Sequence, residues 1–101
     1  MPTNQFKIEV STEAEIDFDA SYEYYSSNSL KAANRFYETI NNYLEFISKN
    51  PSAFPDVFNG VRKYVVHKFP FVIYYQISQN IIKVIAIFHT SRKPEILKSR
   101  I

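Results

Sequence analysis

The amino-acid sequence predicts an α+β fold in which a helical hairpin packs on a small, mostly antiparallel sheet. Two observations predict it. Between residues 61 and 88, three apolar runs rich in Val, Ile, Tyr and Phe are separated by short polar or proline-containing breaks, as in a β-meander. Before them, residues 12–49 carry apolar side chains three or four positions apart, the spacing of amphipathic helices. With an alternating stretch at residues 6–10, the predicted order is β-α-α-β-β-β.

The first predicted strand leads directly into the first predicted helix. Phe6, Ile8 and Val10 alternate with charged residues, which indicates a half-buried strand. Thr12 followed by Glu15 matches a capping box, so we expect the helix to begin there. The helix should end near residues 25–27, and its buried face should consist of Ala14, Phe18, Ser21, Tyr22 and Tyr25.

The second predicted helix follows a polar break at residues 26–29, whose Ser and Asn side chains are good N-caps. It should end at Asn50, because a residue before proline avoids the α region. The short break predicts that the two helices lie antiparallel. The apolar stripe of the second helix consists of Ala33, Phe36, Tyr37, Ile40, Leu44 and Ile47.

The segment 51–60 should cross the edge of the core. Phe54, Val57 and Phe58 are expected there in a turn of 3₁₀ helix, and Gly60, the sole glycine, should adopt a positive φ.

Three strands are predicted after this segment: Val61–Val66, Phe71–Ile77 and Ile81–Phe88. Asn80, in the last break, can adopt the positive φ that tight turns often require. The last strand is apolar on both faces apart from Lys83, so it should be central, with helices on one side. Its other side would be covered either by the C-terminal tail or by a partner protein.

Composition limits the kind of protein. A chain of 101 residues predicts one domain, residues 1–101. Cysteine is absent, which excludes disulfides and thiolate chemistry. The N-terminal residues lack the apolar region of a signal peptide, and no run approaches the roughly 20 apolar residues that span a bilayer, so we expect no membrane association and a cytoplasmic location.

Charge is unevenly distributed along the chain. Residues 1–50 contain four Lys or Arg and eight Asp or Glu, whereas residues 51–101 contain eight and two. A basic half favours an anionic partner. The competing interpretation is that the helices and the sheet simply carry different surface charge.

The sequence lacks a Gly-rich phosphate loop and the HExxH and GxSxG motifs, which excludes the enzyme classes that depend on them. Its two histidines have no neighbouring carboxylate, so we expect no metal site and no cofactor. RNA cleavage needs only a base, an acid and cations. Side chains that could supply these are Arg62, Lys63, His67, Lys68, His89, Arg92 and Lys93.

Strand alternation groups some of these side chains. One face of the first strand should carry Val61, Lys63, Val65 and His67, and one face of the last should carry Ile81, Lys83, Ile85, Ile87 and His89. Alternation alone leaves open whether these two faces lie on the same side of the sheet. The competing interpretation is that both histidines make ordinary hydrogen bonds at strand ends.

Three features stand out beside the order of elements: Arg62, the 69–71 Phe-Pro-Phe link before Tyr74 and Tyr75, and the ending His89-x-x-Arg92-x-Pro94. With these features, the sequence from Phe6 to about Leu97 resembles the RelE/ParE family of bacterial toxins from toxin–antitoxin modules. The resemblance implies a small toxin that is neutralised by a cognate antitoxin wrapped over its sheet and helices. An amphipathic antitoxin segment could then cover the second apolar face of the sheet.

The family divides by target, and the resemblance implies one of two activities. RelE-like members cleave mRNA on the ribosome without a metal, for which His89, Arg62, Lys63 and Arg92 would be the catalytic set. ParE-like members poison DNA gyrase. Here His89 is followed by Thr90 instead of the RelE-type Tyr, and no Tyr follows Tyr75, which favours the ParE-like activity. Contacts with gyrase or antitoxin would then come from Arg62, His67, Lys68, His89, Arg92 and Lys93. A non-toxic binding domain with the same fold is the third alternative.

Overall fold

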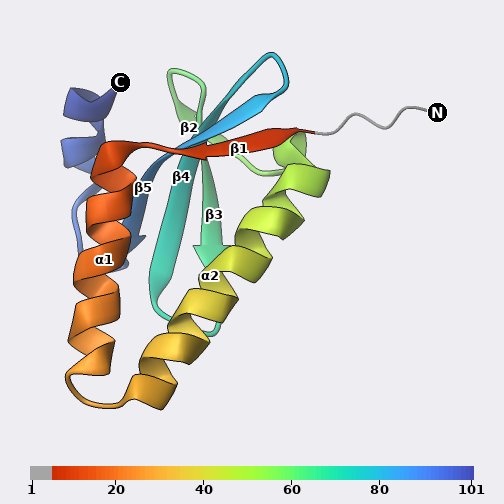
Figure 1. Ribbon diagram of the computed structural model, residues 1–101. Coiled ribbons are helices and arrows are strands. Elements are labelled where there is room, and N and C mark those ends of the chain that lie inside the picture. Colours follow the sequence, from red (N-terminus) through yellow and green to blue (C-terminus); the bar gives the residue numbers. More distant parts are fainter. Residues whose placement is uncertain (1–5) are drawn as a thin grey trace.

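The structure is a computed structural model that describes residues 6–101, and Figure 1 shows the arrangement of its helices and strands. In chain order the elements are β1 (Lys7–Val10), α1 (Thr12–Ser26), α2 (Leu30–Lys49), the 3₁₀ helix η1 (Pro51–Ala53), β2 (Asp56–Phe58), β3 (Val61–Val66), β4 (Phe71–Ser78), β5 (Ile81–His89) and the 3₁₀ helix η2 (Pro94–Arg100).

The strands form one sheet in the order β1-β5-β4-β3-β2. The first strand runs parallel to β5, and every other pair is antiparallel. The α+β class, the helical hairpin and the three-stranded meander are therefore confirmed, and β5 is central as predicted. The additional strand β2 extends the sheet beyond the predicted elements.

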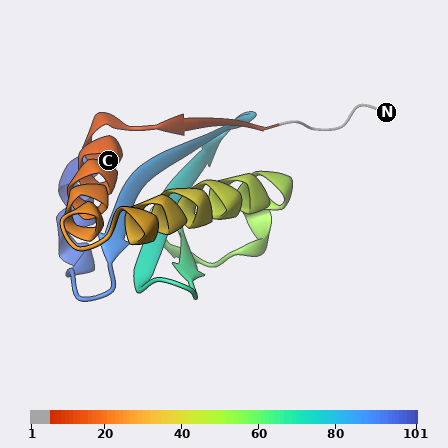
Figure 2. The same cartoon turned by 60° about the horizontal axis from the view of Figure 1, so that its bottom comes forward.

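Helices and tail lie on opposite faces of the sheet. The V formed by α1 and α2 covers one face (Figures 1 and 2), where Phe36, Ile40 and Ile47 pack against strand residues such as Ile73 and Tyr75. On the other face, Leu97 of η2 is fully buried. The tail therefore supplies cover for the second face, against a cluster of Val61, Val72, Tyr74, Ile85, Ala86 and Phe88.

Hydroxyl side chains begin both helices. Ser11 is the N-cap of α1, and its Oγ accepts from the Ala14 N–H at 3.1 Å. The N-cap therefore lies one residue before Thr12, where the capping box was predicted. Ser11 takes this position because its N–H donates to the Val84 carbonyl at 2.9 Å, which keeps Ser11 in an extended conformation at the end of the sheet pairing. Ser29 caps α2 in the same way.

Two predicted helix faces need correction. Tyr37 was expected in the buried stripe of α2 but is 52% exposed. On α1, Ala14 is buried as predicted, Phe18 and Tyr25 are half-buried, and the charged residue Asp17 is buried.

The prediction of a 3₁₀ turn at Phe54–Phe58 is wrong. The 3₁₀ turn lies earlier, at Pro51–Ala53, and Asp56–Phe58 is strand β2. Between β2 and β3, Asn59 and Gly60 have φ of 47° and 79°, the pair of positive values that a two-residue hairpin turn uses.

The positive φ predicted for Gly60 is thus confirmed. In the turn between β4 and β5, the positive φ belongs to Gln79, at 56°, and not to Asn80.

A β-bulge in β5 changes which side chains share a face. Tyr74 lies opposite Ala86 and Tyr75 opposite Val84, so Ile85 is the extra residue. Ile85 and Ala86 both face the tail, whereas Ile87 faces the helices. The predicted single face of Lys83, Ile85, Ile87 and His89 is therefore wrong.

Candidate functional site

Several of the predicted basic residues lie at one end of the sheet. The β3–β4 turn, which contains His67 and Lys68, lies beside the end of β5, because the Thr90 N–H donates to the Pro70 carbonyl at 2.8 Å. Five basic side chains from these segments are exposed: His67, Lys68, His89, Arg92 and Lys93. We call the surface made of these five residues the basic end.

At the basic end, His89 is held by its own connection to η2. Its Nδ1 accepts from the Ser91 N–H at 3.1 Å and lies 2.8 Å from the Ser91 Oγ. A backbone N–H only donates, so Nδ1 must be the acceptor and the neutral ring carries its proton on Nε2. His89 therefore presents a donor to solvent, whereas a general base needs a free lone pair.

The ring of His89 also borders a hollow beside α1. It packs edge-to-face on Phe71, with ring centroids 5.4 Å apart. Tyr24, 67% exposed, lies across this hollow, whose volume is about 380 Å³. Aromatic side chains are enriched at protein interfaces, so this exposed surface could contact a partner.

Arg62 lies elsewhere and has a structural partner set. Its Nη1 donates to the carbonyls of Phe54, at 2.7 Å, and Ser52, at 3.2 Å. Beside it, the buried Tyr75 hydroxyl donates to the Pro51 carbonyl at 2.7 Å. Burial raises the pKa of Tyr75 to about 12, opposed by the Arg62 charge. Both side chains therefore anchor the segment between α2 and β2.

The register of the sheet separates the catalytic set that the RelE-like alternative requires. Arg62 lies opposite Tyr75, and His89 lies opposite Phe71. These β4 positions are about 13 Å apart along the strand, and β3 and β5 are roughly 10 Å apart across it. Lys63 lies opposite Tyr74, on the tail side. The structure does not bring these three side chains together.

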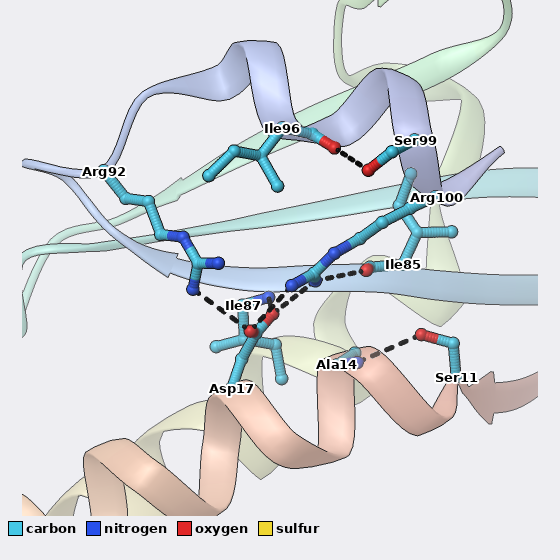
Figure 3. Close-up of polar contacts among 9 residues, drawn as sticks. All are labelled: Ser11, Ala14, Asp17, Ile85, Ile87, Arg92, Ile96, Ser99 and Arg100. Carbon is cyan, nitrogen blue, oxygen red and sulfur yellow. Dashed lines mark hydrogen bonds and ion pairs between the residues drawn. The ribbon is translucent and has the colours of Figure 1, made fainter.

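Sequence reasoning missed a polar cluster centred on Asp17 (Figure 3). Asp17 is 6% exposed. Its carboxylate accepts from Arg100 Nη1 and Nη2 at 2.7 and 3.0 Å, from the Ile87 N–H at 3.1 Å and from Arg92 Nη1 at 3.4 Å. The guanidinium carbon lies 4.9 Å from the centroid of the Phe88 ring in Arg100 and 4.4 Å from it in Arg92.

This cluster connects three parts of the fold: α1, the bulged half of β5, and the tail. Arg100 also donates to the Ile85 carbonyl at 2.9 Å, so it joins the extra residue of the bulge to Asp17. The signal that could have revealed Asp17 is its position three residues after Ala14, on the face of α1 already predicted to be buried.

A second concave surface lies between the two helices. This groove has a volume of about 390 Å³, a floor of Phe18, Ile40 and Leu44, and the carboxylates of Glu15 and Asp19 at its edge. It is acidic and apolar, in contrast with the basic end.

None of the helices in residues 6–101 combines the length and apolar character required to cross a membrane. Within the same residues, His, Asp and Glu side chains form no group of three that could hold a metal ion.

Comparison with known proteins agrees with this architecture. The sequence matches the family described as ParE toxin of type II toxin–antitoxin system, parDE, over residues 8–94. Among solved structures, a chain of the chromosomal ParDE toxin–antitoxin system from P. aeruginosa is similar, with a TM-score of 0.75 and 18% identity, over 86% of this chain and 98% of that one. No curated protein matches. The family match covers most of the chain, and the protein therefore belongs to the ParE toxin family of type II toxin–antitoxin systems.

Proposed function

We propose that this ParE-family toxin inhibits DNA gyrase by protein–protein contact through its basic end, and that its cognate antitoxin neutralises it by covering that surface. The observation that carries the choice of target is the separation of the side chains that RNA cleavage would use. Arg62, Lys63 and His89 occupy two strands and two faces, and a phosphate in a cleavage transition state would need them within a few ångströms.

The state of each side chain supports the same choice. His89 has its Nδ1 lone pair occupied by Ser91, and Arg62 is bonded to two backbone carbonyls. Arg92, whose side chain is 42% exposed, keeps surface available to a partner while Phe88 supports its guanidinium. Arginine held over an aromatic ring is a frequent centre of binding energy in interfaces.

Within the basic end, we assign the main contact to Arg92 and supporting contacts to His67, Lys68, His89 and Lys93. Arg62 is reassigned from contact residue to anchor of the 51–55 segment. Because all five side chains are exposed, an acidic antitoxin segment could cover them and exclude the target.

The experiment is a supercoiling assay in which purified gyrase receives the purified wild-type protein, the Arg92→Ala variant or the Arg35→Ala variant. Arg35 is an exposed cation on α2 and serves as the matched control. We expect wild type and Arg35→Ala to inhibit supercoiling and Arg92→Ala to have lost most of its inhibition while keeping the wild-type circular dichroism spectrum.

A parallel cell-free translation reaction tests the ribosomal alternative by mapping new 5′ ends on the message with and without ribosomes. Ribosome-dependent cuts together with unaffected gyrase would refute the proposal and favour the endoribonuclease. Neither effect, in a correctly folded protein, would favour a non-toxic binding domain.

A further inference from the structure

The cluster around Asp17 is not explained by toxin family membership or by the assignment of Arg92 as a contact residue. We infer that Asp17 is the positioning residue for Arg92: it holds the guanidinium against Phe88, so that the contact surface is formed only where α1, β5 and the tail meet. This inference rests on the proposed role of Arg92.

The surroundings of Asp17 match what a buried carboxylate requires. A buried carboxylate is stable only when its oxygens accept hydrogen bonds and a cation lies beside it. One backbone N–H, from Ile87, and three guanidinium N–H groups supply this. The side chain of Asp17 is 4% exposed and that of Arg100 is 10% exposed, whereas that of Arg92 is 42% exposed.

This gradient of exposure separates the roles of the two arginines. Arg100 makes the short, two-pronged ion pair and a bond to the Ile85 carbonyl, so it neutralises Asp17 and fixes the tail. Arg92 makes only the longer 3.4 Å contact and keeps much of its surface in solvent. Asp17 thus restricts the rotamers of Arg92 without removing it from a partner.

Preorganisation of this kind favours binding, because a long side chain that is already restrained loses less conformational entropy on contact. Arg92 lies in the Thr90–Lys93 connection. Its backbone N–H donates to the His89 carbonyl at 2.9 Å, which fixes the backbone of Arg92 but not the position of its guanidinium. Phe88 and Asp17 fix the end of the side chain.

Removal of Asp17 alone would leave Arg100 buried without its partner, so the test uses a background in which Arg100 has already been replaced. Arg100→Gln keeps Asp17 and its contact with Arg92, which becomes the remaining guanidinium partner of the carboxylate, and circular dichroism establishes that each variant is folded. Asp17→Asn combined with Arg100→Gln removes both buried charges and leaves a neutral amide pair. The two proteins therefore differ in the carboxylate that faces Arg92. Glu45→Gln, an exposed carboxylate on α2, is the matched control.

The first readout is inhibition of supercoiling. We expect Arg100→Gln and Glu45→Gln to inhibit gyrase, and the Asp17→Asn/Arg100→Gln protein to have fallen to the level of Arg92→Ala. Addition of Arg92→Ala to the double variant should then produce no further loss. Equal inhibition by Arg100→Gln and the double variant, with both folded, would overturn the inference, as would a further loss on adding Arg92→Ala.

The second readout needs no target and separates this inference from the proposed function. Trypsin cleaves after Arg92 only if that side chain leaves its site and enters the protease. The rate of this cleavage, measured by mass spectrometry, should be severalfold higher in the double variant than in Arg100→Gln. If wild type does not inhibit gyrase, the proposed function fails, and equal cleavage rates in the two variants would independently reject the positioning role.

Discussion

The hydroxyl of Tyr75 offers a quantitative test of how the segment between α2 and β2 is held. Tyr75 is 0% exposed and donates to the Pro51 carbonyl at 2.7 Å. Replacement by Phe keeps the ring in the core and removes the hydrogen bond. At about pH 8 we expect the variant to be less stable by about 1 kcal/mol, the net worth of one hydrogen bond, measured by urea unfolding.

Alkaline pH should reverse this order of stability. The pKa of Tyr75 rises from 10.0 to about 12 on folding, mainly by burial, so the folded state disfavours the tyrosinate. The contribution of the Tyr75 hydroxyl to stability is complete below pH 10, the pKa of tyrosine in the unfolded chain, and is lost as the pH rises toward 12. At about pH 11 the free energy of unfolding of the wild type has fallen by about 1.4 kcal/mol through titration of Tyr75. The Tyr75→Phe variant has no hydroxyl at this position and does not lose this stability. The two proteins should therefore become equally stable between about pH 10 and pH 11.

Other tyrosines, including Tyr25, Tyr64 and Tyr74, also have pKa values raised by burial, but they are common to both proteins and cancel in the difference. A stability difference that stays constant from about pH 8 to pH 11 would refute the reasoning, because it would mean that the Tyr75 hydroxyl does not titrate from a buried site.

Three further predictions concern the ion pair, a turn and the charge distribution. Asp17→Asn should lower the free energy of unfolding by roughly 3 kcal/mol, since it leaves Arg100 buried without its carboxylate; a urea-measured loss below about 1 kcal/mol would contradict a buried pair. Gly60→Ala should cost about 1 kcal/mol through its φ of 79° alone, because an added Cβ meets nothing within 4 Å, and an unchanged thermal midpoint would refute this. Binding of the cognate antitoxin, followed by calorimetry, should weaken as NaCl rises, and an affinity insensitive to salt would indicate a purely apolar interface.

Local pattern in the sequence was sufficient for the elements and for much of the core. Spacing of three and four identified Phe36, Ile40 and Ile47, because a helix that packs on a sheet must bury one stripe. Apolar residues on both faces of the 81–88 run indicated a central strand, because an edge strand would expose them. The Asn59-Gly60 pair is typical of a two-residue hairpin turn. It could have indicated a strand before it as well as after it, but only the following strand, β3, was predicted.

The candidate site was less accessible. The basic residues were identified by type, but their grouping depended on alternation, and one extra residue at Ile85 turned His89 to the other face of β5. A bulge leaves little trace where a run is apolar on both faces, since an apolar side chain suits either face of a sheet that is covered on both sides. The assignments of His67, Lys68, His89, Arg92 and Lys93 as contact residues stay predictions.

By itself, the sequence determined the fold class, the helical hairpin, the meander and the family resemblance, because these depend on local periodicity and on residues near one another in the chain. Only the tertiary structure decided that Arg62 anchors a loop, that the tail covers the second face, and that Asp17 binds arginines 75 and 83 residues away. Burial in the folded state determines such pairs. A carboxylate that folding removes from water requires a nearby cation, and that cation can come from any part of the chain.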